Sequence, residues 1–245
     1  MVMAFSAPLH AADLRVLAGG AVQPILQSLT PQFEKATGIT VELHFGVVGS
    51  LQKRVMSGEK ADVLLLPVAL IDGLDKAAAF RAQSRTALGR VGVGVAVREN
   101  ARVPDVSTPE AVRAMLLEAR TVAFPDPKLT PSGGHLLRVF EQLGIAEAMQ
   151  PKITFKNAID GGVNLVRDGQ VDIGLFIVTE VLPVKGVKLA GVLPASMQSY
   201  AVYVAAIAAD TASAEAASRF VKFLADPALQ AQWKAAGFDP ADAGK

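Results

Sequence analysis

The sequence predicts an α/β protein with two lobes, and three observations carry this prediction. Short apolar runs alternate with helix-like segments along most of the 245 residues, an order that is typical of α/β domains. Several apolar runs end at small or glycine-containing turns, directly before a helix-like segment begins. The chain is also long enough for two lobes of ordinary size.

The first part of the chain contains three predicted strands, each followed by a helix-like segment. In the first helix, Ile25, Leu29 and Phe33 recur at a spacing that places them on one buried face. Ser50 is a predicted N-cap for the second helix. The third strand is apolar throughout, which is typical of a parallel sheet covered on both faces. The strands are predicted at 13–18, 39–45 and 62–66, and the helices at 22–37, 51–56 and 69–78.

The second part of the chain repeats the alternation and predicts a second α/β lobe. Thr108 is a predicted cap for its first helix, and Pro227 starts the last helix of the chain, a position that proline favours. The predicted strands span 91–97, 121–124, 171–178 and 200–208. The predicted helices span 108–117, 132–143, a short segment from Glu147, 158–167, 212–225 and 227–236.

Composition excludes several classes of function. The net charge is +1 and no basic run is present, so a nucleic-acid surface is not expected. The absence of cysteine excludes disulfides, thiolate metal sites and a cysteine nucleophile. The three histidines are not at metal-ligand spacing, and no P-loop, dinucleotide fingerprint or GxSxG elbow occurs. We therefore expect no metal, no cofactor and no enzymatic activity.

Residues 1–12 are apolar and rich in small residues, and 9–11 resemble a signal-peptidase site. A positive n-region and a full apolar core are missing, so we interpret the segment as the remnant of a signal peptide. The alternative is the N-terminus of a cytoplasmic protein. No later run reaches the roughly 20 apolar residues of a membrane span. We expect a periplasmic protein.

Three strand-to-helix joints carry the functional prediction. They span 17–21, 45–50 and 124–134, and each contains glycine. Glycine allows the backbone to approach a ligand closely, and a helix N-terminus offers unpaired N–H groups. Joints that converge on one point would bind an anion without a metal. The alternative at 19–20, at Ser50 and at Ser132 is an ordinary turn or helix cap.

The order of these segments resembles the periplasmic molybdate-binding proteins of ABC importers, a family of type II solute-binding proteins. The resemblance extends from about Leu14 to Phe238, and it rests on several collinear stretches rather than on one motif. These stretches are Gln32–Lys35, Gly49–Leu51, Gly58–Leu66, Phe124–Gly133, Gly174–Phe176 and Lys234–Phe238.

The resemblance implies a two-lobed type II periplasmic-binding-protein fold with the ligand in the cleft between the lobes. Lobe 1 is expected to comprise residues 13–88 plus 200–245, and lobe 2 residues 89–199. The lobes are expected to close on the ligand by a hinge motion. The resemblance also implies a monomer that delivers a small anion to an ABC permease in the inner membrane.

The resemblance further implies which residues face the ligand, and several depart from the family pattern. The family's first hydroxyl position falls on Ala21, its serine-rich loop on Val48 or Gly49, and its second-lobe tyrosine on Ile177. A buried oxyanion without donors is unfavourable, so an organic acid is favoured over molybdate. The expected ligand-binding residues are Gly20, Ala21, Val48, Gly49, Ser50, Ser132, Gly133, Ile159, Asp160 and Ile177.

The sequence also fits other functions. The protein is alternatively a molybdate- or tungstate-binding protein, a ligand sensor, or a small-acid enzyme on the same fold. Asp160 is expected to cap the following helix; if it faced the cleft instead, it would favour a cationic or hydroxylated ligand.

Overall fold

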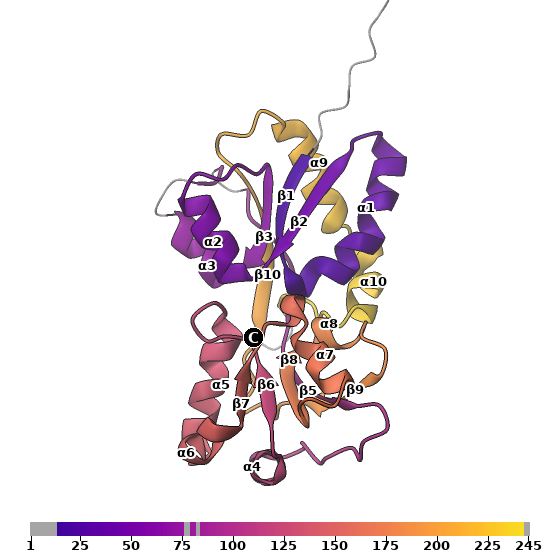
Figure 1. Ribbon diagram of the computed structural model, residues 1–245. Helices are drawn as coiled ribbons and strands as arrows, with labels where there is room; N and C mark the ends of the chain where they lie inside the picture. Colours follow the sequence, from indigo (N-terminus) through magenta and orange to yellow (C-terminus); the bar gives the residue numbers. More distant parts are fainter. Residues whose placement is uncertain (1–13, 76–78, 82–83, 243–245) are drawn as a thin grey trace, which may run out of the picture.

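The computed structural model describes residues 14–75, 79–81 and 84–242 and shows two α/β lobes (Figure 1). Each lobe is built on a five-stranded sheet, with strand order β2-β1-β3-β10-β4 in the first and β7-β6-β8-β5-β9 in the second. The predicted α/β class and the two-lobed fold are confirmed. Residues 1–12, interpreted above as a signal-peptide remnant, lie outside the described residues.

Lobe 1 combines the start of the chain with its end. Helices α2 and α3 cover one face of its sheet, while α1 and α9 cover the other (Figure 1). Its elements are β1 (Leu14–Gly19), η1 (Gly20–Val22), α1 (Gln23–Thr37), β2 (Val41–Gly46), α2 (Val48–Met56), β3 (Val63–Pro67), α3 (Val68–Asp75), β4 (Thr86–Val91), β10 (Ala201–Ile207), α9 (Ala214–Leu224), η4 (Pro227–Leu229) and α10 (Gln230–Ala235). Neighbouring side chains of β1 therefore pack in different clusters, Val16 on the α1 side and Leu17 on the α2 side.

Lobe 2 is formed by the middle of the chain. Its elements are β5 (Val93–Arg98), α4 (Pro109–Glu118), β6 (Val122–Phe124), α5 (Pro131–Gln142), α6 (Ala146–Met149), η2 (Gln150–Lys152), β7 (Ile153–Phe155), η3 (Ala158–Asp160), α7 (Gly162–Arg167), β8 (Ile173–Ile177), α8 (Val178–Val181) and β9 (Val187–Val192). The predicted cap at Thr108 is confirmed, because its Oγ1 accepts a hydrogen bond of 3.1 Å from the N–H of Ala111.

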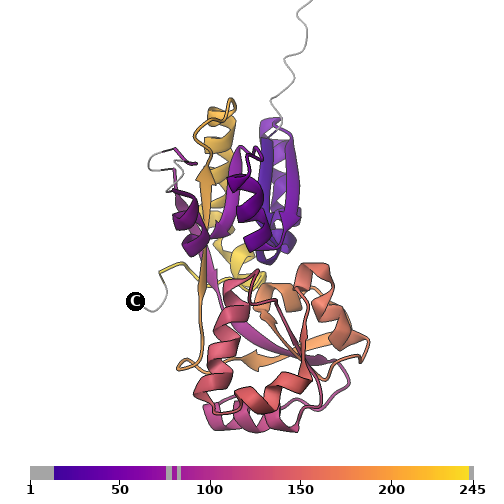
Figure 2. The same ribbon diagram turned by 60° about the vertical axis from the view of Figure 1, so that its left-hand side comes forward.

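Two chain segments connect the lobes. The outward segment passes from β4 to β5 at Gly92, and the return segment leads into β10, which runs along both lobes (Figure 2). The side chain of Gln198 holds the two segments together: its Oε1 accepts from the N–H of Val93 at 2.8 Å, and its Nε2 donates to the Val93 carbonyl at 2.9 Å. Because β4 extends to Val91, the sheets suggest a division a few residues after the predicted 88/89 boundary.

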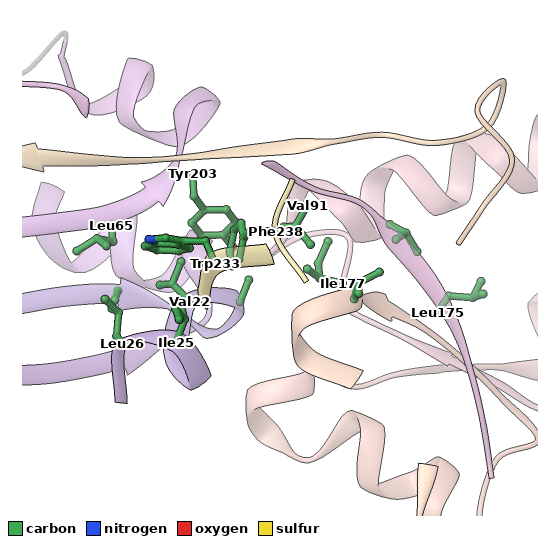
Figure 3. Packing of buried hydrophobic residues seen from close by; sticks show 14 of the residues in the cluster. Val22, Ile25, Leu26, Leu65, Val91, Leu175, Ile177, Tyr203, Trp233 and Phe238 are labelled. Carbon is green, nitrogen blue, oxygen red and sulfur yellow. The ribbon is translucent and has the colours of Figure 1, made fainter. Parts of the chain in front are cut away.

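One hydrophobic cluster extends through both lobes at these crossings. Phe238 packs edge-on against Trp233 and Tyr203, with ring centroids 5.0 Å and 5.8 Å apart. Figure 3 shows these three rings in lobe 1 with Val91 and Ile177 next to them on the side of lobe 2. The base of the cleft between the lobes is therefore an apolar core.

Several predicted elements differ from the structure. Ser50 does not cap α2, because the helix begins at Val48 and its N-cap position is Val47. The predicted helix at 158–167 is interrupted at Gly161, whose φ of 90° lies in the left-handed region. Strands β4, β7 and β9 were not predicted.

Candidate functional site

A cavity lies between the lobes, and we call it the cleft cavity. A water-sized molecule has about 50 Å³ available to it there, and the total unfilled space is about 500 Å³ when the open solvent at the mouth is included. Its lining residues come from both lobes and from β10. They are Gly20, Gly46, Val47, Val48, Pro67, Pro125, Thr130, Pro131, Ser132, Asn157, Ala158, Ile159, Ile177, Glu180, Ala201 and Tyr203.

The three strand-to-helix joints of the sequence all reach this cavity. Gly20 comes from the first joint, Val48 from the second and Ser132 from the third. The start of α2 approaches from lobe 1 and the start of α5 from lobe 2, so two helix N-termini border the same space. Unpaired N–H groups at such ends favour negatively charged ligand atoms.

The structure places half of the expected ligand-binding residues on the wall of the cavity. Gly20, Val48, Ser132, Ile159 and Ile177 line it. The other five do not: Ala21 and Gly133 are buried, Gly49 and Ser50 lie further along α2, and Asp160 is exposed. The carboxylate of Asp160 accepts a hydrogen bond of 3.0 Å from Nδ2 of Asn157, so it does not point into the cavity as a free group.

Glycine is needed at positions 19 and 20 because other side chains lie very close to the backbone there, and not because the backbone has an unusual conformation. Gly19 has an ordinary extended φ of −67°. A Cβ atom added there would lie 2.6 Å from the Val48 side chain, and one added at Gly20 would lie 3.2 Å from Oε1 of Glu180. The side chains of Val48 and Glu180 therefore pack directly against the backbone of this turn.

The start of α5 is capped by Thr130 and not by Ser132. The Thr130 Oγ1 accepts a hydrogen bond of 3.1 Å from the N–H of Gly133 and donates one of 3.0 Å to the carbonyl of Asp126. Because Thr130 has taken the capping role, the Ser132 hydroxyl on the cavity wall is not used as an N-cap.

Replacing Thr130 with alanine is expected to lower the free energy of unfolding by about 1 kcal/mol, because the N–H of Gly133 loses its acceptor. Urea unfolding measures the change. Thr108→Ala, which removes an equivalent cap from α4 away from the cavity, is the matched control and should lower it by a similar amount. An unchanged stability for Thr130→Ala alone would contradict the capping role.

The two lobes touch next to the lining residues Val48 and Thr130. The N–H of Gly49 in α2 donates a hydrogen bond of 3.0 Å to the carbonyl of Leu129 in lobe 2. The backbones approach so closely that a Cβ atom at Gly49 would lie 2.5 Å from that carbonyl oxygen. This contact defines a closed arrangement of the lobes.

Glu180 and Tyr203 are the two titratable side chains on the cavity wall, and the sequence reasoning missed both. Residue Glu180 is partly exposed as a whole, whereas its carboxyl group is enclosed. Burial raises the pKa of this carboxyl from its ordinary value of 4.5 to about 7, and a backbone hydrogen bond at Ile177 opposes part of the rise. Burial, and to a lesser extent the charge of Glu180, raises the pKa of the Tyr203 phenol.

A sequence signal for Glu180 did exist. The residue follows the fully buried strand β8 by three positions, and ligands of α/β sheets bind at the carboxyl ends of strands. Tyr203 carries a hydroxyl group in strand β10, whose other residues are apolar. Asn157 was also missed; its amide bonds to the N–H of Asp126 and to Asp160, which holds the loops of lobe 2 at the cavity.

The cavity contains no cationic group and no metal centre within the described residues. No lysine, arginine or histidine lines it. No cluster of three or more His, Asp or Glu side chains suited to a metal ion occurs in residues 14–75, 79–81 and 84–242. Charge in a ligand would therefore be balanced by backbone N–H groups, by hydroxyls, or by a proton on Glu180.

A family profile described as bacterial extracellular solute-binding protein matches residues 14–239. The chain belongs to this family. Its predicted, divergent relation to the molybdate-binding proteins of ABC importers is confirmed by similar proteins. Members of the family act outside the cytoplasm as capture proteins of ABC importers, bind small anions and interact with permeases.

Of two similar proteins, one is named as an enzyme and the other as a binding protein. An aconitate isomerase of Pseudomonas sp is 28% identical over 230 residues, which cover 90% of this chain and 86% of the relative. The molybdate-binding protein ModA of Escherichia coli K12 is 24% identical over 183 residues, covering 74% and 71%. The chain is thus similar both to a protein named as an enzyme and to one named as a binding protein.

Solved structures support the fold. A periplasmic molybdate-binding protein of Azotobacter vinelandii superimposes with a TM-score of 0.79 at 22% identity, covering 92% of this chain and 98% of that one. Within the described residues, no helix has both the length and the apolar character that crossing a membrane requires.

Proposed function

We propose that this chain is a monomeric, periplasmic capture protein of an ABC importer, and that its cleft closes on a small organic acid rather than on molybdate. The observation that carries the proposal is the composition of the cavity wall. Apolar side chains occupy positions where the resemblance places hydroxyl donors, and a carboxyl group, Glu180, faces the ligand space.

The carboxyl group argues against a compact inorganic dianion. Two like charges in an enclosed site repel strongly, since the local dielectric is low. A carboxyl whose pKa is raised to about 7 is able to hold a proton and donate a hydrogen bond to a ligand carboxylate. Val48, Ile159 and Ile177 offer apolar surface to the carbon chain of such an acid.

The test is thermal unfolding of the purified protein with molybdate, tungstate, sulfate, phosphate and a panel of organic acids that includes aconitate. We expect an organic acid to raise the midpoint by about 5–10 °C at a hundredfold excess over its Kd, because it binds only the folded state. A shift with molybdate or tungstate and with none of the acids would overturn the proposal.

A second function, isomerisation of a bound acid, is favoured by one comparison and one geometric observation. The relative of 28% identity is named an aconitate isomerase, and the cavity holds a carboxyl and a phenol. Capture and turnover use the same cleft, so the ligand panel above precedes any test of turnover.

A further inference from the structure

We propose that Glu180 and Tyr203 form a proton-transfer pair that acts on a carbon–hydrogen bond of the bound acid. Glu180 is the base and Tyr203 a hydrogen-bond donor to the charge that develops. This inference rests on the proposed function, because it requires a carboxylic acid in the cleft cavity. It assigns these two residues a chemical role in addition to ligand capture.

The side chains of Glu180 and Tyr203 both lie next to the backbone of Gly19 and Gly20. A Cβ atom added at Gly20 would lie 3.2 Å from Oε1 of Glu180, and one added at Gly19 would lie 3.3 Å from the Tyr203 hydroxyl. Glu180 reaches this place from α8 of lobe 2, and Tyr203 from the connecting strand β10. An acid held at the Gly19–Gly20 turn would therefore meet both groups.

Glu180 has a backbone hydrogen bond at Ile177, and the Tyr203 ring packs against Phe238. No salt bridge among the described residues involves Glu180, and no side-chain hydrogen bond in that part of the chain involves the Tyr203 hydroxyl. Tyr203 is only 4% exposed, yet it contributes to the cavity wall. Because both residues line the cavity, a ligand bound there would contact both side chains.

The electrostatics suit a base that works near neutral pH. The pKa of the Glu180 carboxyl lies at about 7 because the group is enclosed. At neutral pH both its ionised and its protonated form are present, which is the best condition for accepting a proton and returning it. The raised pKa of Tyr203 keeps the phenol protonated and able to donate.

The chemistry balances without any further reactant. The Glu180 carboxylate takes a proton from a carbon next to a carbon–carbon double bond, and that C–H bond breaks. Its electron pair spreads over the allylic carbons into the adjacent carboxylate, to which the Tyr203 O–H donates a hydrogen bond. The Glu180 carboxyl then returns a proton to the other end of the allylic unit. The double bond has moved, and nothing has been oxidised or reduced.

The experiment uses cis-aconitate in deuterated water and follows its protons by NMR. We expect the wild-type protein to introduce deuterium at the methylene carbon and to form the trans isomer, with a rate that rises with pH as Glu180 ionises. Glu180→Gln should retain the thermal shift with aconitate and lose exchange by at least about a hundredfold. Tyr203→Phe should exchange more slowly than the wild type.

Matched variants separate a chemical role from a structural one. Glu141→Gln changes an exposed acid on α5 and should exchange at the wild-type rate. Glu180→Asp keeps a carboxyl and should retain slow, pH-dependent exchange, which covers the case in which Glu180→Gln does not fold.

The possible outcomes distinguish the proton-transfer pair from the capture function. Wild-type binding of aconitate without exchange would overturn the proton-transfer pair and leave the proposed capture function intact. Exchange by Glu180→Gln at the wild-type rate would also overturn the pair. A panel in which no organic acid binds would overturn both proposals.

Discussion

Glu180→Gln is expected to raise the free energy of unfolding at pH 8 by roughly 2–3 kcal/mol and to leave it almost unchanged at pH 4. The carboxyl has a pKa of about 7 in the folded protein and an ordinary value of 4.5 in the unfolded chain. The folded state therefore binds this proton more tightly, so the wild type loses stability as the pH rises from 4.5 to 7. Glutamine carries no charge and avoids this loss.

Urea unfolding of both proteins at pH 4, 6 and 8 measures this difference. Tyr203, the other titratable group on the cavity wall, stays protonated over the whole range, because its pKa is raised. Glu141→Gln, which removes a solvent-exposed acid, is the control and should show no comparable dependence on pH. The same difference at pH 4 and pH 8 would contradict an enclosed, titrating Glu180.

This prediction also bears on ligand capture. An anion that enters the cavity adds a negative charge beside Glu180 and favours its protonated form. Binding of an organic acid is therefore expected to take up protons near pH 7. The same carboxyl thus lowers stability in the empty protein. In the complex its protonated form donates a hydrogen bond, and proton abstraction requires the ionised form, which becomes more populated as the pH rises.

Most of the fold could be predicted from the sequence, because its main strands and helices show clear apolar runs or helical spacing of apolar residues. The run Leu64–Leu66 is apolar throughout and became a central strand, and Ile25, Leu29 and Phe33 of α1 are buried as their spacing indicated. The edge strands β4 and β9 were missed because they alternate polar and apolar residues weakly and contain glycine.

Only some residues of the candidate site could be predicted from the sequence, because the site is formed by contacts between segments that are distant in the chain. Glycine-containing joints pointed to the cleft, and each of the three contributes to the cavity wall. Residues 180 and 203 meet only through the packing of α8 and β10 near the Gly19–Gly20 turn, and no local pattern shows this. The family pattern drew attention to Ala21, which is buried off the cavity, and it did not indicate Tyr203, whose side chain contributes to the cavity wall.

Gly49→Ala is expected to weaken ligand binding about tenfold to a hundredfold without lowering the stability of the empty protein. In the closed arrangement its Cβ would lie 2.5 Å from the carbonyl oxygen of Leu129, where the Gly49 N–H now donates a hydrogen bond of 3.0 Å. Overpacking of this kind costs about 1–3 kcal/mol. In an open arrangement the clash is absent, and alanine is the better helix former within α2.

The two measurements should therefore change in opposite directions. Calorimetric titration with the acid found in the ligand panel should report a weaker Kd, because only the closed state holds the ligand from both lobes. Thermal unfolding without ligand should report an equal or higher midpoint. Gly134→Ala adds a methyl group in α5 with no atom nearer than 3.9 Å, so it should gain helix stability and keep its affinity. If Gly49→Ala binds as tightly as Gly134→Ala, the contact between Gly49 and Leu129 does not control closure, and the ligand must be held mainly by one lobe.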